Sequence, residues 1–300
     1  MAALLSALFV PRSEALRAAP APLLAAVAMV AFAANSILCR MALGAGLIDP
    51  ASFTAVRIVT GAATLALLLI VRDRAIRVRR PSLIGAAALF VYMAGFSFAY
   101  VSLDAGVGAL ILFGCVQITM FAAAFRSGER FGALALLGLA LAMAGLVVLV
   151  APGEASAPSL AGAALMALAG VAWGAFTLEG RGQGDPLAAT GWSFFAIAPV
   201  AALLWTPFAP QAEATGAGLA LAAASGALAS GAGYATWYAA LRTLSASRAS
   251  IIQLSVPVIA ALGGAALLSE PVTGRLAAAS ALSLGGIGLF LRARQAPKRA

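Results

Sequence analysis

The chain has 300 residues, of which 63% are apolar and 10% are charged, and its net charge is +9. An ordinary soluble domain carries about 25% charged residues, so the composition excludes that class and favours a membrane protein. The sequence contains no histidine, which excludes a histidine-based metal site or proton relay. It also has no glycine-rich phosphate loop ending in lysine and serine or threonine, which argues against ATP-driven transport.

Continuous apolar stretches follow one another along the whole chain. Each is near the roughly 20 residues that a helix needs to cross a bilayer. Membrane-spanning strands would instead show shorter segments of alternating polarity. The predicted fold class is therefore an all-α integral membrane protein with ten transmembrane helices. The ten stretches are residues 22–43, 51–71, 82–101, 106–125, 131–150, 160–177, 187–206, 217–241, 249–268 and 273–291.

Basic residues are distributed unevenly between the two sides that these crossings define. If the N-terminus is cytoplasmic, most of the 19 basic residues lie in cytoplasmic segments, and the external segments hold only Arg275. Lysine and arginine accumulate on the cytoplasmic side of membrane proteins. Both termini are therefore predicted to be cytoplasmic, in a multi-pass protein of the cell inner membrane. Because the charge follows membrane topology, it does not indicate a nucleic-acid partner.

The two halves of the chain share a register, which indicates an internal repeat. Glu129 and Glu270 are each followed sixteen residues later by a glycine, Gly145 and Gly286, within a stretch of small residues. Upstream, an Asp-Pro pair precedes the second helix of each half. The predicted domains are an N-terminal cytoplasmic segment at 1–21, five-helix repeats at 22–150 and 151–292, and a basic cytoplasmic tail at 293–300.

Five helices in each half is an odd number, so the second half must enter the membrane from the opposite side. Inverted repeats are typical of secondary transporters, which hold the substrate near the midplane where the repeats meet. We therefore expect two inverted five-helix repeats around a central cavity.

The second half carries a motif that resembles a known family. Pro257-Val258 lies in the ninth predicted helix, and Ser269-Glu270 follows it. This pattern is similar to the EamA type of the drug/metabolite transporter superfamily, although Val116 stands where the first half would have its proline. The resemblance implies a ten-helix basket that exports amino acids, nucleobases, drugs or other metabolites. Amino acid exporters of the YddG type are the nearest subgroup.

Polar side chains inside the predicted helices are the first candidates for substrate binding, because a charged or polar group in lipid is costly. Arg57 could hold a substrate carboxylate, pair within the bundle or snorkel to the surface. Asn35, Gln117 and Gln253 could bind the amino and carboxylate groups of a zwitterion, or could serve as hydrogen bonds between helices.

Aromatic side chains are the second group of candidates. Tyr92 and Phe96 share one face of the third predicted helix at a spacing of four residues. Trp173, Tyr234 and Trp237 come from the sixth and eighth helices. These rings could line an apolar cavity wall, or could form an aromatic belt at the membrane interface.

Gly231 and Pro257 are candidates for a gating role, since glycine permits close helix contact and proline should kink the middle of its helix. Static packing is the alternative. The two cysteines, Cys39 and Cys115, fall in different helices and are expected to be free thiols.

The function predicted is facilitated export of small organic metabolites, with amino acids as the leading substrate class, by alternating access. No aspartate or glutamate falls in the middle of a predicted helix, and proton-coupled carriers usually place a carboxylate there. A multidrug exporter is the alternative within this class, and a non-transporting scaffold or a membrane enzyme is the alternative outside it. The expected partners are a small-molecule substrate and the lipid bilayer, in a monomer or weak dimer with no cofactor and no metal.

Overall fold

The computed structural model describes residues 20–73, 81–151, 157–180, 184–242, 244, 249 and 252–295. Almost all of the predicted segment 1–21 and most of the predicted tail 293–300 lie outside these ranges. The first five membrane-crossing helices are α3 (Ala21–Gly44), α4 (Pro50–Asp73), α5 (Leu83–Ala99), α6 (Ala105–Arg126) and α7 (Ala133–Val150).

The second half continues with α8 (Leu160–Glu179), α9 (Pro186–Trp205) and a short 3-10 helix, η1 (Thr206–Gln211). Its eighth crossing is one continuous segment with three parts: α10 (Gly216–Ala224), the π-helical η2 (Ser225–Ala232) and α11 (Gly233–Leu241). The last two crossings are α13 (Ser255–Leu268) and α14 (Gly274–Gln295).

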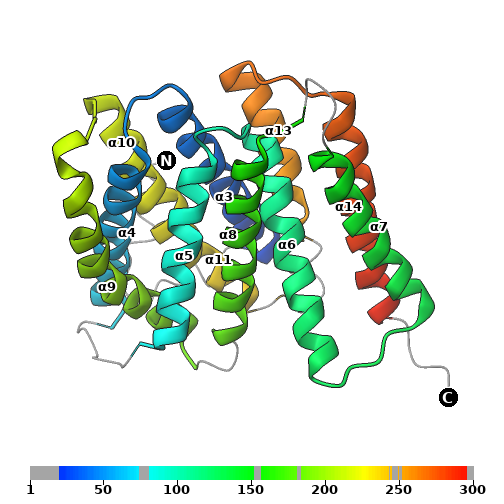
Figure 1. The fold of residues 1–300 in the computed structure, drawn as a ribbon. Coiled ribbons are helices and arrows are strands. Elements are labelled where there is room, and N and C mark those ends of the chain that lie inside the picture. Colours follow the sequence, from blue (N-terminus) through cyan, green and yellow to red (C-terminus); the bar gives the residue numbers. More distant parts are fainter. Residues whose placement is uncertain are drawn as a thin grey trace.

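These segments confirm the predicted fold class. Eight of them are long and apolar enough to cross a bilayer, and α5 and α13 are shorter apolar helices. Their connections alternate between the two ends of the bundle, as Figure 1 shows, so both ends of the described chain lie on the same side. Each half therefore crosses five times, and the second half runs inverted relative to the first.

Helix packing follows the same inverted pairing. Three helices of the first repeat pack against their own counterparts in the second, as α4 does with α9, α6 with α13 and α7 with α14. The other contacts are also repeated between the halves. For example, α3 packs against the eighth crossing, and its counterpart α8 packs against α5, which is the counterpart of the eighth crossing. Helices from both repeats therefore surround the centre of the bundle.

The Asp-Pro pairs that marked the repeat begin equivalent helices. Asp49 accepts a hydrogen bond from the backbone N–H of Ser52 at 2.8 Å, and Asp185 accepts one from that of Ala188 at 3.2 Å. The carboxylate of each aspartate thus binds an otherwise unpaired N–H in the first turn of its helix, where proline needs no N–H partner.

The ninth crossing differs from its prediction. It was expected to be one helix from residue 249, and the described residues 249, 252 and 253 are helical, but Leu254 forms a turn and α13 begins at Ser255. Pro257 therefore occupies the first turn of α13 instead of its middle. A proline is tolerated there because the first N–H groups of a helix have no partner within it. The crossing is thus interrupted at Leu254, three residues before Pro257, and the gating role of Pro257 stays a prediction.

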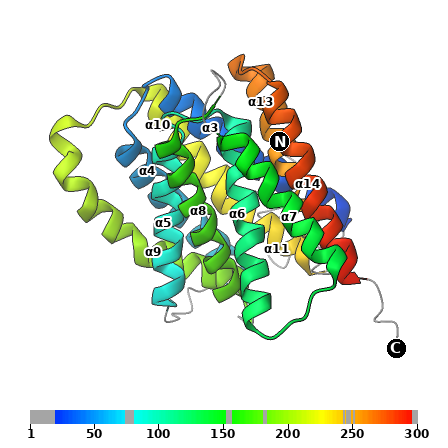
Figure 2. The same ribbon diagram turned by 45° about the vertical axis from the view of Figure 1, so that its right-hand side comes forward.

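The pair α7 and α14 packs closely through small residues, and the two helices lie side by side in both Figure 1 and Figure 2. A Cβ atom added to Gly286 would lie 2.5 Å from the backbone N of Ala142 and 2.5 Å from the backbone O of Gly138. The repeat-related Gly145 lies directly against Ser283. The glycines that defined the repeat therefore set the distance between its two final helices.

Replacement of Gly286 by alanine should destabilise the protein, because the new methyl group meets backbone that cannot rotate away. Strain of this kind costs about 1–3 kcal/mol. Gly288→Ala is the matched control on the same helix, since nothing lies within 4 Å of its added Cβ. Thermal unfolding in detergent should show a lower midpoint for Gly286→Ala and an unchanged or higher one for Gly288→Ala. Equal midpoints would contradict the packing described.

Candidate substrate site

A small cavity lies at the centre of the bundle, where the two repeats meet. Phe32 of α3, Tyr92 of α5 and Ser230 of η2 line it, and each is near the middle of its membrane crossing. The cavity volume is about 20 Å³, which is room for roughly one water molecule. The remaining lining residues are Asn35, Ser36, Phe96, Leu112, Phe113, Trp173, Ala229 and Tyr234.

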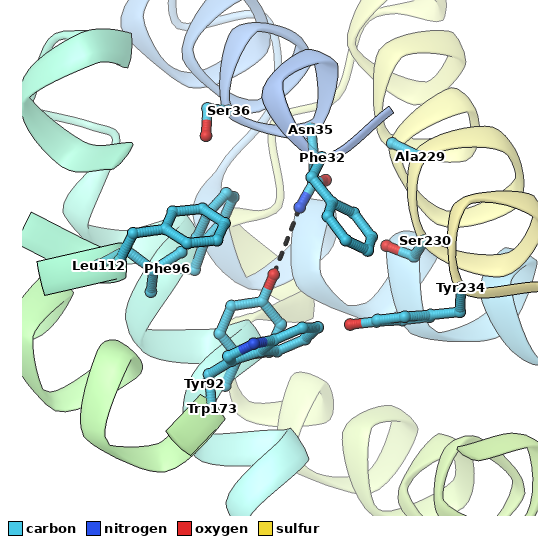
Figure 3. Close-up of a pocket in the computed structure, with 11 residues that line it drawn as sticks. Phe32, Asn35, Ser36, Tyr92, Phe96, Leu112, Trp173, Ala229, Ser230 and Tyr234 are labelled. Carbon is cyan, nitrogen blue, oxygen red and sulfur yellow. Dashed lines mark hydrogen bonds between the residues drawn. The ribbon is translucent and has the colours of Figure 1, made fainter. Parts of the chain in front are cut away.

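Aromatic rings form one wall of this cavity. Figure 3 shows Phe32, Tyr92, Trp173 and Tyr234 close together, from helices of both repeats. The Trp173 and Tyr234 rings stack with centroids 5.3 Å apart, and the Tyr92 and Trp173 centroids are 4.5 Å apart. Such ring faces offer a large apolar surface to the body of an organic molecule.

Arg57 lies directly behind the lining and is fully buried, with 0% of its surface exposed. Its Nη2 donates a hydrogen bond to the hydroxyl of Tyr92 at 2.9 Å, and its Nε donates one to Ser230 at 3.3 Å. The guanidinium carbon is 4.8 Å from the ring centroid of Phe96 and 5.2 Å from that of Tyr92. All three residues that Arg57 contacts in this way line the cavity.

The charge of Arg57 has no partner of opposite sign among the described residues. No described carboxylate lies within 4 Å of it, and its Nη1 has no hydrogen-bond partner. Full burial excludes the snorkelling alternative. The partners of Arg57 within the bundle are two hydroxyl groups and two aromatic rings, and none of its described partners is acidic.

Asn35 connects the same network to α3. Its Oδ1 accepts a hydrogen bond from Ser225 at 2.6 Å, and its Nδ2 donates to the Tyr92 hydroxyl at 3.4 Å. Tyr92 thus accepts hydrogen bonds from both Asn35 and Arg57. The spacing of Tyr92 and Phe96 predicted that both lie on one aromatic face. It gave the Tyr92 hydroxyl no role, because periodicity indicates which face a residue occupies but not which polar atoms meet there.

The π-helical segment η2 brings Ser230 to Arg57. A Cβ atom added to Gly226 would meet the backbone O of Arg57 and the side chain of Thr60, and one added to Gly231 would lie 2.8 Å from Thr64. Glycine at these two positions therefore allows η2 to lie directly against α4. Short π-helical turns often occur at functional sites, and this one carries Ser225, Ala229 and Ser230.

Ion pairs join helices at the end of the bundle predicted to be external. Arg40 of α3 binds Glu270 at 3.1 Å and Asp104 at 3.4 Å, and its Nη1 donates to the carbonyl of Val101 at 3.1 Å. Glu270 also accepts from the backbone N–H of Ala105 at 2.8 Å. This cluster joins the end of α3 to the start of α6 and the end of α13. Burial raises the pKa of Glu270, while the Ala105 N–H and Arg40 act in the opposite direction.

A second ion pair joins helices at the opposite end. Arg72 at the end of α4 binds the carboxylate of Asp185 at the start of α9, with Nη1 3.0 Å from Oδ1. The small central cavity thus lies between two ends that are each held by an arginine.

Comparison with known proteins assigns the family. Residues 19–151 and residues 160–292 each match the EamA-like transporter family. The chain belongs to the EamA-like transporter family. It is thus a multi-pass membrane transporter of the drug/metabolite transporter superfamily, as the motif around Pro257 and Glu270 predicted.

Two relatives extend this comparison of the EamA-like chain. An uncharacterized protein of Pseudomonas aeruginosa is 56% identical over 272 residues, which cover 91% of this chain and 94% of that protein. An uncharacterized transporter of Archaeoglobus fulgidus is 28% identical over 218 residues, covering 70% and 76% respectively. A crystal structure with 22% sequence identity and a TM-score of 0.60 covers 88% of this chain and 97% of its own, and it supports the fold alone.

The structure brings together some of the predicted site residues of this EamA-like transporter. Asn35, Phe96, Trp173 and Tyr234 line the cavity, and Arg57 lies against it. Trp237 is one contact further away, with its ring centroid 6.1 Å from that of Phe32. The other predicted residues do not line the cavity. Gln117 is half-buried on α6, and Gln253 is half-buried just before α13. Gly231 packs against α4, and Pro257 lies in the first turn of α13. The two cysteines are free, as expected.

Loss of the Arg40 ion pairs should open the predicted external end. Ser36 lines the cavity four residues before Arg40 and is fully buried, so it reports opening when replaced by cysteine after both native cysteines have been removed. We expect Arg40→Gln to increase labelling of that cysteine by an external, membrane-impermeant thiol reagent several-fold. Arg72→Gln is the matched control at the opposite end and should not increase it. Labelling that Arg40→Gln leaves unchanged would show that these ion pairs do not close the bundle.

Proposed function

We propose that this EamA-like transporter exports amino acids across the cell inner membrane, with both termini in the cytoplasm. The observation that carries the proposal is the central cavity, which combines an aromatic wall with a buried polar network of Asn35, Tyr92 and Arg57. An amino acid presents the matching groups, a polar head and an organic side chain. The orientation is supported by the excess of basic residues on the predicted cytoplasmic side.

The position of the network supports transport by alternating access. The polar groups come from α3, α4 and α5 of the first repeat and from η2 of the second. A substrate bound between them would contact both repeats at once. If the repeats tilt relative to each other, such a site opens to one side and then to the other while its lining changes little.

Facilitated export is favoured over proton-driven export. None of the cavity-lining residues is acidic, and the described aspartates and glutamates lie in connections or at the ends of helices. A carboxylate that binds and releases a proton at the midplane is therefore not found in the described part of the chain. The same feature disfavours multidrug export of cations, because no acidic group near the cavity would attract them.

Downhill amino acid efflux should be independent of a proton gradient. Purified protein in liposomes loaded with labelled neutral amino acids should release them faster than protein-free liposomes do. A protonophore should leave that rate unchanged, because no titrating group is required in the cycle. Strict dependence on an imposed proton gradient would refute the facilitated mechanism, and absence of efflux for every amino acid would refute the proposed substrate.

Replacement of Asn35 by leucine should lower amino acid flux several-fold while the protein still folds. The change keeps the number of side-chain heavy atoms and the branch at Cγ but removes the amide that joins Ser225 to Tyr92. Hydrogen bonds between membrane helices contribute on average about 0.6 kcal/mol, so the loss of stability should be modest. Ser193→Ala is the matched control, since Ser193 is buried but bonds only within its own helix, to Ala189. Equal flux in the two variants would place the site elsewhere.

A further inference from the structure

We infer that Arg57 binds the carboxylate of the substrate and that this transporter is selective for organic carboxylates with an apolar or aromatic body, whether or not they carry an ammonium group. The inference rests on the proposed function in one respect, namely that the central cavity is the transport site. It goes further because it makes the carboxylate the group that is recognised and the amino group dispensable.

The first support is the incomplete pairing of a buried charge. A charged side chain in the membrane interior is costly and therefore needs compensating contacts. Arg57 recovers part of this cost through two hydrogen bonds and through two aromatic rings at 4.8 and 5.2 Å. Its Nη1 remains without a partner among the described residues. A carboxylate could accept from Nη1 and Nη2 together, in the two-bond geometry that guanidinium groups prefer.

The second support is the position of the guanidinium relative to the cavity. Tyr92, Phe96 and Ser230 contact Arg57 and also line the cavity. The guanidinium is therefore in contact with side chains that line the cavity, and a carboxylate in the cavity reaches it when those side chains move. The present volume of about 20 Å³ is too small for such a ligand, so binding requires the aromatic wall to move apart.

The third support is the sign of charge around the cavity. No lining residue is acidic, and no described carboxylate lies within 4 Å of Arg57. A substrate ammonium would meet ring faces and neutral side chains such as Asn35 and Ser36, while a cation without a carboxylate would be repelled by Arg57 in a medium of low dielectric constant. The net charge of the site thus favours anions over zwitterions and zwitterions over cations.

Three probes with the same benzyl body separate these charges at about pH 6: 3-phenyllactate is an anion, phenylalanine is a zwitterion, and phenylalaninamide is mainly a cation, because an α-amino group titrates above that pH. Efflux from proteoliposomes is measured for each, with the leak of protein-free liposomes subtracted. We expect phenyllactate to move at least as fast as phenylalanine, and phenylalaninamide at least tenfold more slowly than either.

Replacement of Arg57 by glutamine should lower phenyllactate flux tenfold or more and reduce its advantage over phenylalaninamide. Arg57→Lys should keep that preference at lower flux, because lysine keeps the charge but not the two-bond geometry. Arg275→Gln is the matched control, since Arg275 binds the backbone carbonyl of Leu149 at the predicted external end and its loss should leave the preference unchanged. Thermal unfolding of each variant identifies any that fail to fold.

The outcomes separate this inference from the proposed function. Phenylalanine efflux without phenyllactate efflux would overturn the inference and leave amino acid export standing. Phenyllactate efflux without phenylalanine efflux would support the inference and overturn amino acid export. If Arg57→Gln does not fold, the probe series in the unaltered protein decides, and fast efflux of phenylalaninamide would overturn the inference by itself.

Discussion

The burial of one positive charge at the centre of the bundle explains most of the arrangement around it. Arg57 must be surrounded by groups that tolerate a cation in a lipid environment, and it is held by the Tyr92 and Ser230 hydroxyls and by two aromatic ring faces. These contacts fix the depth at which α5 and the eighth crossing meet α4. They also leave Nη1 of the guanidinium without a partner among the described residues, and this is the nitrogen to which we assign a substrate carboxylate.

The two repeats supply different parts of this centre, although they share a fold. Ser193 follows Asp185 by eight residues, as Arg57 follows Asp49, so it is the equivalent of Arg57 in the second repeat. Its hydroxyl donates to the carbonyl of Ala189 in its own helix. The second repeat instead contributes the π-helical turn with Ser225 and Ser230, and Trp173 and Tyr234 of the aromatic wall. The inverted repeat therefore sets how the helices are arranged, whereas the polar and aromatic groups around the cavity come from positions at which the two repeats differ. The ion pairs at the two ends of the bundle also differ. Arg40 joins α3, α6 and α13 at one end, whereas Arg72 joins α4 and α9 at the other.

Sequence reasoning predicted the crossings, the inverted repeat and the family, because hydropathy and an odd helix count depend only on local composition and order. It also predicted that Arg57, Asn35, Trp173 and Tyr234 were candidates, since polar and aromatic residues inside a lipid-spanning stretch need a reason. It could not predict that Tyr92 joins Asn35 to Arg57, or that Arg40 pairs with Glu270, because these contacts link residues that are 35 to 230 positions apart. The π-helical turn was also missed, although Gly231 within it was predicted as a position of close helix contact.

The central claim is that the unpartnered nitrogen of Arg57 receives a substrate carboxylate. A structure of the transporter with 3-phenyllactate bound tests this most directly. The account predicts that the carboxylate lies about 2.7–2.9 Å from Nη1 of Arg57, with the phenyl ring among Phe32, Trp173 and Tyr234 and the aromatic wall moved apart. A ligand whose carboxylate lies away from Arg57, with the contacts of Arg57 to Tyr92 and Ser230 unchanged, would contradict it.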